Sequence, residues 1–157
     1  MITLEKITWD NWEDCLSLKV KDEQDDFIAS NMYSLAQSYV ALLNDELPPM
    51  TYAICKDATV IGFVMMYHDT AEESDYGEES YGVCRFMIDK NYQGKGYGKD
   101  AFQKVLDLIK TYPRGDAVSV YLSYNPENEG ARRLYASFGF GETGDIADDE
   151  VVAKLAL

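Results

Sequence analysis

The sequence from Arg85 to Phe102, Arg-Phe-Met-Ile-Asp-Lys-Asn-Tyr-Gln-Gly-Lys-Gly-Tyr-Gly-Lys-Asp-Ala-Phe, decides the fold of this 157-residue chain. Its first residues are apolar, as in a short buried strand, and apolar residues later recur at helical spacing. Gly94, Gly96 and Gly98 stand between the two elements. Glycines leave backbone N–H groups free to converge on one anion, and the following helix adds the positive end of its dipole. The stretch therefore predicts a phosphate-binding turn.

Two common phosphate-binding motifs do not match this turn. A Walker loop requires Gly five residues before its Gly-Lys pair and Ser or Thr after it, but these places hold Gln93 and Asp100. A dinucleotide-binding fingerprint requires a glycine where Lys99 stands. The pattern that remains is Gln93-x-x-Gly96-x-Gly98. A glycine-rich turn without a ligand is the alternative interpretation.

The charge of the chain favours some partners over others. It has 28 acidic and 14 basic residues, a net charge of −14. Contacts to phosphates need a basic surface, so we expect no nucleic-acid partner. The charge favours a cationic partner or substrate, although acidity also serves solubility alone.

Composition predicts a soluble globular protein that forms a single domain over residues 1–157. Hydrophobic residues make up 46% and charged residues 27%, and no apolar run approaches membrane-spanning length. The first residues do not follow the basic and then apolar pattern of a signal peptide, so we expect a cytoplasmic protein with no membrane association. Cys15, Cys55 and Cys84 are widely spaced in apolar segments, which predicts buried thiols and no metal site.

The remaining elements follow from hydrophobic periodicity. The pattern predicts strands at Ile2–Ile7, 52–55, 59–67 and 81–88, near 118–122 and from 151 onwards, with helices after Asp10, over 20–43, 98–112 and 131–138. In the helix over 20–43, with a possible break near Ser30, one apolar stripe should face the core: Phe27, Ile28, Met32, Leu35, Tyr39 and Leu42. The predicted fold class is α/β (α+β), with a mixed, mostly antiparallel sheet of six to seven strands and helices on both faces. The glycine turn lies at the end of a β-α-β unit, where ligands commonly bind.

A second motif lies about forty residues after the glycine turn and reads Asn128-x-x-Ala131-x-x-Leu134-Tyr135-x-x-x-Gly139-Phe140. Its apolar residues also fit an ordinary core face. In this order and at this separation, the two motifs resemble the coenzyme A signatures of the GNAT superfamily of N-acetyltransferases. The resemblance extends from the first strand to the last and implies a GNAT-like fold and acetyl-CoA as cofactor.

The resemblance also implies a set of cofactor-binding residues. The backbone of the strand would pair with the pantetheine amides at Phe86 and Ile88, and N–H groups near Met87 would polarise the thioester carbonyl. The turn would hold the pyrophosphate through Gln93, Gly94, Lys95, Gly96, Tyr97, Gly98 and Lys99. Asn125 and Asn128 would contact the arm from the second motif. Tyr135 matches the general acid that protonates the departing thiolate, since a phenol is protonated at neutral pH.

Three further features are the block Val20-x-x-x-Gln24-x-x-Phe27-Ile28 followed by Asn31, an acidic loop, and the run Arg85-Phe86-Met87-Ile88-Asp89. Together they resemble bacterial spermine/spermidine N-acetyltransferases, which implies direct attack by a polyamine amine. The residues implied in acceptor binding are Gln24, Phe27, Arg85, and the carboxylates of the acidic loop from Asp69 to Glu79, namely Glu72, Glu73, Asp75, Glu78 and Glu79. Glu78 and Glu79 are also the candidate general bases, acting through ordered water. His68, the only histidine, is read as a strand-edge residue outside the catalytic set.

Other interpretations remain open from the sequence. Related GNAT enzymes acetylate aminoglycosides, peptide N-termini or lysines, and a GNAT fold can bind acyl-CoA without turnover. The acidic loop also fits a solvated excursion. A homodimer is a common outcome in the superfamily and is possible here.

Overall fold

The computed structural model describes residues 1–157, which form one seven-stranded sheet with helices on both faces. The strands lie in the order β1-β2-β3-β4-β5-β7-β6. In chain order the elements are β1 (Ile2–Lys6), α1 (Trp12–Ser17), the 3₁₀ helix η1 (Asp22–Phe27), α2 (Asn31–Asn44), β2 (Met50–Lys56), β3 (Thr59–Asp69), β4 (Ser80–Ile88), α3 (Tyr97–Ile109), β5 (Ser119–Tyr124), α4 (Glu129–Ser137), β6 (Gly141–Ala147) and β7 (Glu150–Ala156). The predicted fold class is confirmed.

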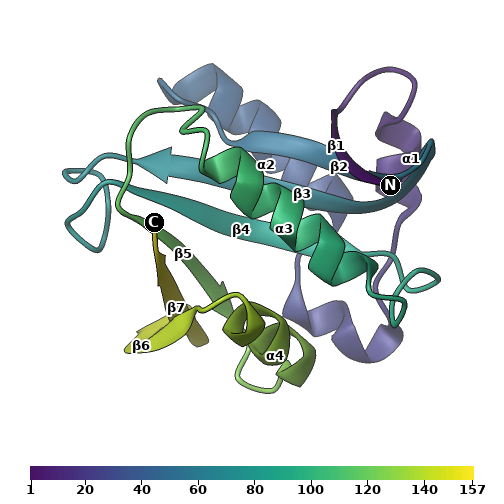
Figure 1. The fold of residues 1–157 in the computed structure, drawn as a ribbon. Coiled ribbons are helices and arrows are strands. Elements are labelled where there is room, and N and C mark those ends of the chain that lie inside the picture. Colours follow the sequence, from purple (N-terminus) through teal and green to yellow (C-terminus); the bar gives the residue numbers. More distant parts are fainter.

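The only parallel neighbours in the sheet are β4 and β5, which α3 connects as the predicted crossover helix. Their pairing runs from Ser80 opposite Ser119 to Val83 opposite Leu122 and then stops. Beyond this point the two strands diverge, and Figure 1 shows β5 turning away from β4. The second half of β4 therefore has one edge that no strand covers.

The two faces of the sheet carry separate apolar cores. In Figure 1, α3 crosses in front of the long central strands, while α1 and α2 lie behind them. On the α3 face, the ring of Phe102 is fully buried and lies 5.2 Å from Phe86 of β4 and 5.0 Å from Tyr135 of α4. On the other face, Phe63, Met65 and Met87 form a smaller cluster. Phe102 thus fixes α4 against β4.

The segment expected to be one helix over 20–43 is two elements, so the break near Ser30 is real. Ser30 ends the connection from η1 and caps α2, because its side-chain oxygen accepts a hydrogen bond from the amide of Tyr33 at 3.1 Å. The expected apolar stripe was wrong for three residues: Met32, Tyr39 and Leu42 are each more than 60% exposed. The buried residues of α2 are instead the polar Asn31 and Ser34.

The three cysteines are free thiols, with Cys15 and Cys55 buried and Cys84 half-buried. None of the helices has both the length and the apolar character needed to cross a membrane.

Gly82 of β4 lies under the ring of Tyr67 on the neighbouring strand. A Cβ added at Gly82 would overlap Cζ, Cε1 and the hydroxyl oxygen of Tyr67. Only glycine leaves room for the phenol at this position, so the close approach fixes the pairing of β3 with β4 beside the diverging edge.

We expect Gly82→Ala to lower the free energy of unfolding by about 1–3 kcal/mol, because the methyl group displaces the Tyr67 ring from its place on the sheet. Urea unfolding would measure the change. Gly141→Ala is the matched control, since a Cβ there meets no atom within 4 Å. Equal stabilities of the two variants would contradict the assigned packing.

Candidate active site

A cavity of about 810 Å³ opens where β4 and β5 diverge. Its walls come from β4, the glycine turn, the segment before α2, the end of β5, helix α4 and the β6–β7 turn. Such a volume is typical of small-molecule sites. Of the residues singled out in the sequence, those that line the cavity are Gln24, Phe27, Arg85, Phe86, Met87, Ile88, Gln93, Gly94, Gly98, Asn125, Asn128 and Tyr135.

The glycine turn offers a row of unused amide donors. Between Gly94 and Lys99, no backbone N–H donates a hydrogen bond within the protein, and α3 has no side-chain N-cap. Gly94 and Gly96 have φ of +74° and +85°, and added Cβ atoms would point into open space. Free amides at a helix N-terminus bind phosphates. The residues present therefore fit the pyrophosphate of a coenzyme A.

Unlike its free backbone amides, side chains of the glycine turn make contacts within the protein. Lys95 Nζ donates to the carbonyl oxygen of Asn91 at 3.3 Å and lies over the ring of Tyr92. Tyr97 packs against the core, with Lys56 above its ring. Neither Lys95, Tyr97 nor Lys99 lines the cavity. What they can offer a ligand here is their backbone N–H groups and, for the two lysines, long-range charge.

Gln93 and Gln24 contact each other, although the sequence analysis places them in different subsites. The Gln93 side-chain amide donates to Gln24 Oε1 and to the carbonyl oxygen of Ile88, both at 2.9 Å. Asp89 makes a second link, because its Oδ1 accepts from the amide of Lys19 at 2.9 Å. These bonds hold the segment before α2, which includes Phe27, against the end of β4.

The exposed edge of β4 provides a place for an extended ligand. Cys84 is the extra residue of a β-bulge, since Met65 pairs with Arg85 and Met66 with Val83. After the bulge, Phe86 and Ile88 continue along an edge that β5 no longer pairs with. An extended chain with amide groups can bind such an edge as an added strand.

Tyr135 of α4 points its ring into the aromatic core around Phe102 while lining the cavity. The residue is 8% exposed, and its hydroxyl has no hydrogen-bond partner within the protein. Burial is the main cause that raises the pKa of Tyr135, and the carboxylate of Glu150 adds to it. The phenol therefore stays protonated at neutral pH and can donate.

Asn125 and Asn128 shape the start of α4. Asn128 is its N-cap, with Oδ1 accepting from the amide of Ala131 at 3.1 Å. Asn125 Oδ1 accepts from the amide of Glu127 at 2.9 Å. Both residues line the cavity, and their side-chain NH₂ groups make no bond within the protein. Each can therefore donate to a ligand while holding the helix in place.

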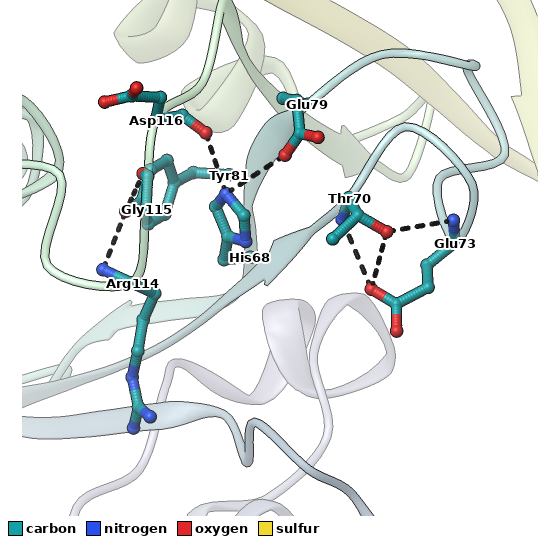
Figure 2. A network of polar contacts seen from close by, with 8 residues as sticks. All are labelled: His68, Thr70, Glu73, Glu79, Tyr81, Arg114, Gly115 and Asp116. Carbon is teal, nitrogen blue, oxygen red and sulfur yellow. Dashed lines mark hydrogen bonds and ion pairs between the residues drawn. The ribbon is translucent and has the colours of Figure 1, made fainter.

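The acidic loop is not part of the cavity lining, and three of its carboxylates have partners within the protein. Figure 2 shows Glu73 accepting from the amide and hydroxyl of Thr70, at 3.2 and 3.0 Å. Glu79 lies 3.8 Å from His68 Nε2, which also contacts the carbonyl oxygen of Asp116 at 2.9 Å. The structure does not bring Glu72, Glu73, Asp75, Glu78 or Glu79 together with Tyr135 as cavity-lining residues.

Glu78 is engaged by residues of β5 and β7 through one carboxylate oxygen. Its Oε1 contacts Lys154 Nζ and the Tyr121 hydroxyl, each at 2.6 Å, and the Ser119 hydroxyl at 2.8 Å. The hydrogen bond from Lys154 is the largest of the causes that lower the pKa of Glu78 to about 2. A carboxylate held ionised in this way is a poor proton acceptor, so the geometry does not favour Glu78 as the base.

Four carboxylates that the sequence analysis did not select line the cavity: Asp26, Asp148, Asp149 and Glu150. Asp148 and Asp149 have φ of +48° and +64° and form the tight turn between β6 and β7. Glu150 Oε1 accepts from the Ser123 hydroxyl at 3.1 Å. The sequence signal for this turn is the Asp-Asp pair before the last apolar run, which predicts a hairpin turn. Nothing in the neighbouring residues indicates that the turn lies at this cavity.

Comparison with known proteins agrees with this geometry. Residues 4–140 match the family described as Acetyltransferase (GNAT) family. The chain belongs to the GNAT family of acetyltransferases. Its cosubstrate is acetyl-CoA, whose pyrophosphate is an anion of the kind that the free amides of the glycine turn can bind.

Two curated relatives of this GNAT chain come from Bacillus subtilis. A probable spermine N(1)-acetyltransferase of subsp. natto (strain BEST195) is 28% identical over 146 residues, covering 92% of this chain and 91% of the relative. The spermine/spermidine N(1)-acetyltransferase of strain 168 is 27% identical with the same coverage.

Solved structures share the GNAT fold at lower identity. The PaiA N-acetyltransferase from Thermoplasma acidophilum, in complex with coenzyme A, matches with a TM-score of 0.71 at 13% identity, covering 100% of this chain and 99% of the other. The aminoglycoside acetyltransferase AAC(6')-Ib, also with coenzyme A, matches with a TM-score of 0.74 at 18% identity, covering 99% and 95%.

The contact between Glu78 and Lys154 should make the free energy of unfolding depend on pH in the acid range. A pKa lowered from 4.5 to about 2 contributes stability that is complete above pH 4.5 and is lost as the pH falls toward 2. We therefore expect wild type to exceed Glu78→Gln in free energy of unfolding by an amount that is constant near pH 7 and shrinks below pH 4.5. Urea unfolding at pH 7, 4.5 and 3 measures this difference. Glu72→Gln, in the same loop, is the control; a pH-independent difference for Glu78→Gln would contradict the pairing.

Proposed function

We propose that this GNAT enzyme transfers the acetyl group of acetyl-CoA to a primary amine of a polyamine such as spermine or spermidine. The observation that carries the proposal is the set of four carboxylates, Asp26, Asp148, Asp149 and Glu150, on the cavity that Tyr135 also lines. The names of the two Bacillus subtilis relatives support the same acceptor class.

The electrostatics of the cavity suit a polycation. Primary ammonium groups have a pKa of about 10 and are charged at neutral pH, so carboxylates attract them. Arg85 is the one basic side chain that lines the cavity. Its guanidinium is turned aside, with Nη1 donating to the carbonyl oxygen of Cys84 at 2.8 Å and Nη2 to Gln37 at 3.3 Å. Phe27 adds an apolar surface for the methylene segments between amines.

Acetyl transfer to an amine requires two proton movements: the ammonium loses a proton before attack, and the departing thiolate gains one. Tyr135 supplies the second, because its protonated phenol lines the cavity without a competing partner. Glu150 is the best-placed base. It lines the same cavity as Tyr135, and its one side-chain bond within the protein comes from the Ser123 hydroxyl.

Direct attack by the amine fits the state of the cavity thiol. Cys84 lines the cavity, but burial raises the pKa of its thiol to about 11, and Sγ donates to the carbonyl oxygen of Met65 at 3.4 Å. A thiol, unlike a thiolate, is a weak nucleophile. The chemistry therefore favours direct transfer without an acetylated cysteine.

Replacing Tyr135 with Phe should lower kcat by about 100-fold or more, within the usual range for loss of a general acid. The affinity for acetyl-CoA should stay within about twofold, because the ring and its packing on Phe102 remain. Thiol release gives kcat, and titration of the protein with acetyl-CoA gives the affinity. An unchanged kcat would remove Tyr135 from the mechanism.

The turn carboxylates should decide acceptor affinity. We expect the pair Asp148→Asn and Asp149→Asn to raise KM for spermine by about tenfold or more, and KM for a monoamine much less, since only the polycation uses several carboxylates. Glu72→Gln with Glu73→Gln, two acidic-loop changes outside the cavity, is the charge-matched control. If the control pair raises KM for spermine as much as the turn pair, acceptor binding depends on overall charge and not on this turn.

A thiol-release screen of acetyl-CoA with polyamines, aminoglycosides and lysine peptides tests the acceptor class. Aminoglycosides are the second candidate, because they are also polycations and AAC(6')-Ib shares the fold. The proposal expects kcat/KM to be highest for linear polyamines. If only aminoglycosides are acetylated, the cavity carboxylates bind aminoglycosides and not polyamines. If the protein binds acetyl-CoA but acetylates no amine, it is a binding module.

A further inference from the structure

The side chain of Gln24 in η1 accepts two hydrogen bonds through one oxygen. Gln24 Oε1 accepts from the backbone amide of Lys21 at 3.1 Å and from the side-chain amide of Gln93 at 2.9 Å. The orientation of both side chains follows from their other partners, because the N–H of Lys21 can only donate and the Ile88 carbonyl, which Gln93 also contacts, can only accept. Both lone pairs of Gln24 Oε1 are therefore in use.

An oxygen in this state is a poor ligand for the amine that the enzyme acetylates. A protonated amine offers only N–H donors and needs free acceptors. The side-chain NH₂ of Gln24 is itself a donor, so it cannot bind an ammonium group. Although Gln24 lines the cavity, its contacts are those of a residue that holds other residues in place.

The helix η1 depends on this contact more than the other helices depend on any single bond. None of its six residues is buried. Its four carboxylates, on Asp22, Glu23, Asp25 and Asp26, are exposed and form no ion pair. Short 3₁₀ helices have weak hydrogen-bond geometry of their own. The bond between Gln24 and Gln93 is the one hydrogen bond that joins η1 to another part of the chain.

Gln93 connects this bond to the glycine turn, because it directly precedes Gly94. The backbone amides from Gly94 to Lys99 have no partner within the protein. A pyrophosphate that accepts hydrogen bonds from these amides restricts the motion of the turn. The same restriction then applies to the partner that holds Gln24.

We propose that Gln24 is a positioning residue that couples cosubstrate binding to the acceptor side of the cavity. Pyrophosphate fixes the glycine turn, and the bond from Gln93 to Gln24 then fixes η1. Asp26 and Phe27, at the end of η1, are thereby held as part of the cavity wall. The coupling is reciprocal, so an acceptor that holds η1 also favours binding of the cosubstrate. Only the acceptor half of this coupling rests on the proposed function.

Hydrogen–deuterium exchange of the full chain, with and without CoA, tests the half that needs no acceptor. In wild type, saturating CoA should slow exchange at residues 22–29 by about 2- to 10-fold, the range for one hydrogen bond between neutral groups. Exchange at residues 97–100, beside the pyrophosphate, should slow as well. Gln24→Met should keep the protection of residues 97–100, which shows that the variant folds and binds CoA, and lose that of residues 22–29.

Two further variants separate positioning from a general effect of substitution. Gln103→Met is the matched control, because Gln103 lies on α3 and bonds only Asp107; protection of residues 22–29 should persist. Gln24→Glu should also keep it, since a carboxylate oxygen can still accept from Lys21 and Gln93. Exchange at residues 22–29 that does not respond to CoA in wild type, or that responds equally in Gln24→Met, would overturn the proposal.

Titration with CoA, which has no acetyl group to transfer, tests the acceptor half. Saturating spermine should tighten CoA binding in wild type, and Gln24→Met should lose about 2- to 10-fold of this enhancement. Gln103→Met should retain it, as should Gln24→Glu at lower overall affinity for CoA. The same enhancement in Gln24→Met as in wild type would contradict the coupling. If spermine does not bind, the proposed acceptor is wrong, and the exchange measurement still decides the role of Gln24.

Discussion

The divergence of β4 from β5 is the constraint on which the site depends. Parallel pairing ends at Val83 opposite Leu122, and the backbone beyond it needs hydrogen-bond partners that no strand provides. The bulge at Cys84 redirects the strand at the same point. A cosubstrate that carries amide groups can supply the missing partners. The same gap lets α4 bring Tyr135 to the cavity between the strands.

Under the proposed function, one cavity recognises groups of opposite charge by different means. Anionic pyrophosphate fits backbone amides of the glycine turn, whose direction is set by positive φ at Gly94 and Gly96. A cationic acceptor fits the carboxylates of Asp26 and the β6–β7 turn. Because amides carry no net charge, the turn can hold phosphate without lysine side chains in a cavity that, in our proposal, also admits a cation.

The structure distinguishes carboxylates that are bonded within the fold from carboxylates that line the cavity and can bind a ligand. Glu78 is bound to Lys154, Tyr121 and Ser119, and Glu73 accepts hydrogen bonds from Thr70 at the base of its loop. Glu150 has a single hydroxyl partner and lines the cavity. Carboxylates that look equivalent in the sequence therefore differ in their ability to bind a ligand or accept a proton, because some of them already accept hydrogen bonds within the fold.

By itself, the sequence determined the sheet class, the crossover between β4 and β5, the glycine turn and the position of Tyr135. These depend on local periodicity and on glycine geometry, which neighbouring residues set. Only the tertiary structure decided that the Asp148–Asp149 turn and Asp26 meet at one cavity, that Gln24 bonds Gln93, and that α2 faces outward with its apolar side. These features join residues far apart in the chain, or depend on which side of a helix finds a buried hydrogen-bond partner, as Asn31 does at the carbonyl oxygen of Cys15.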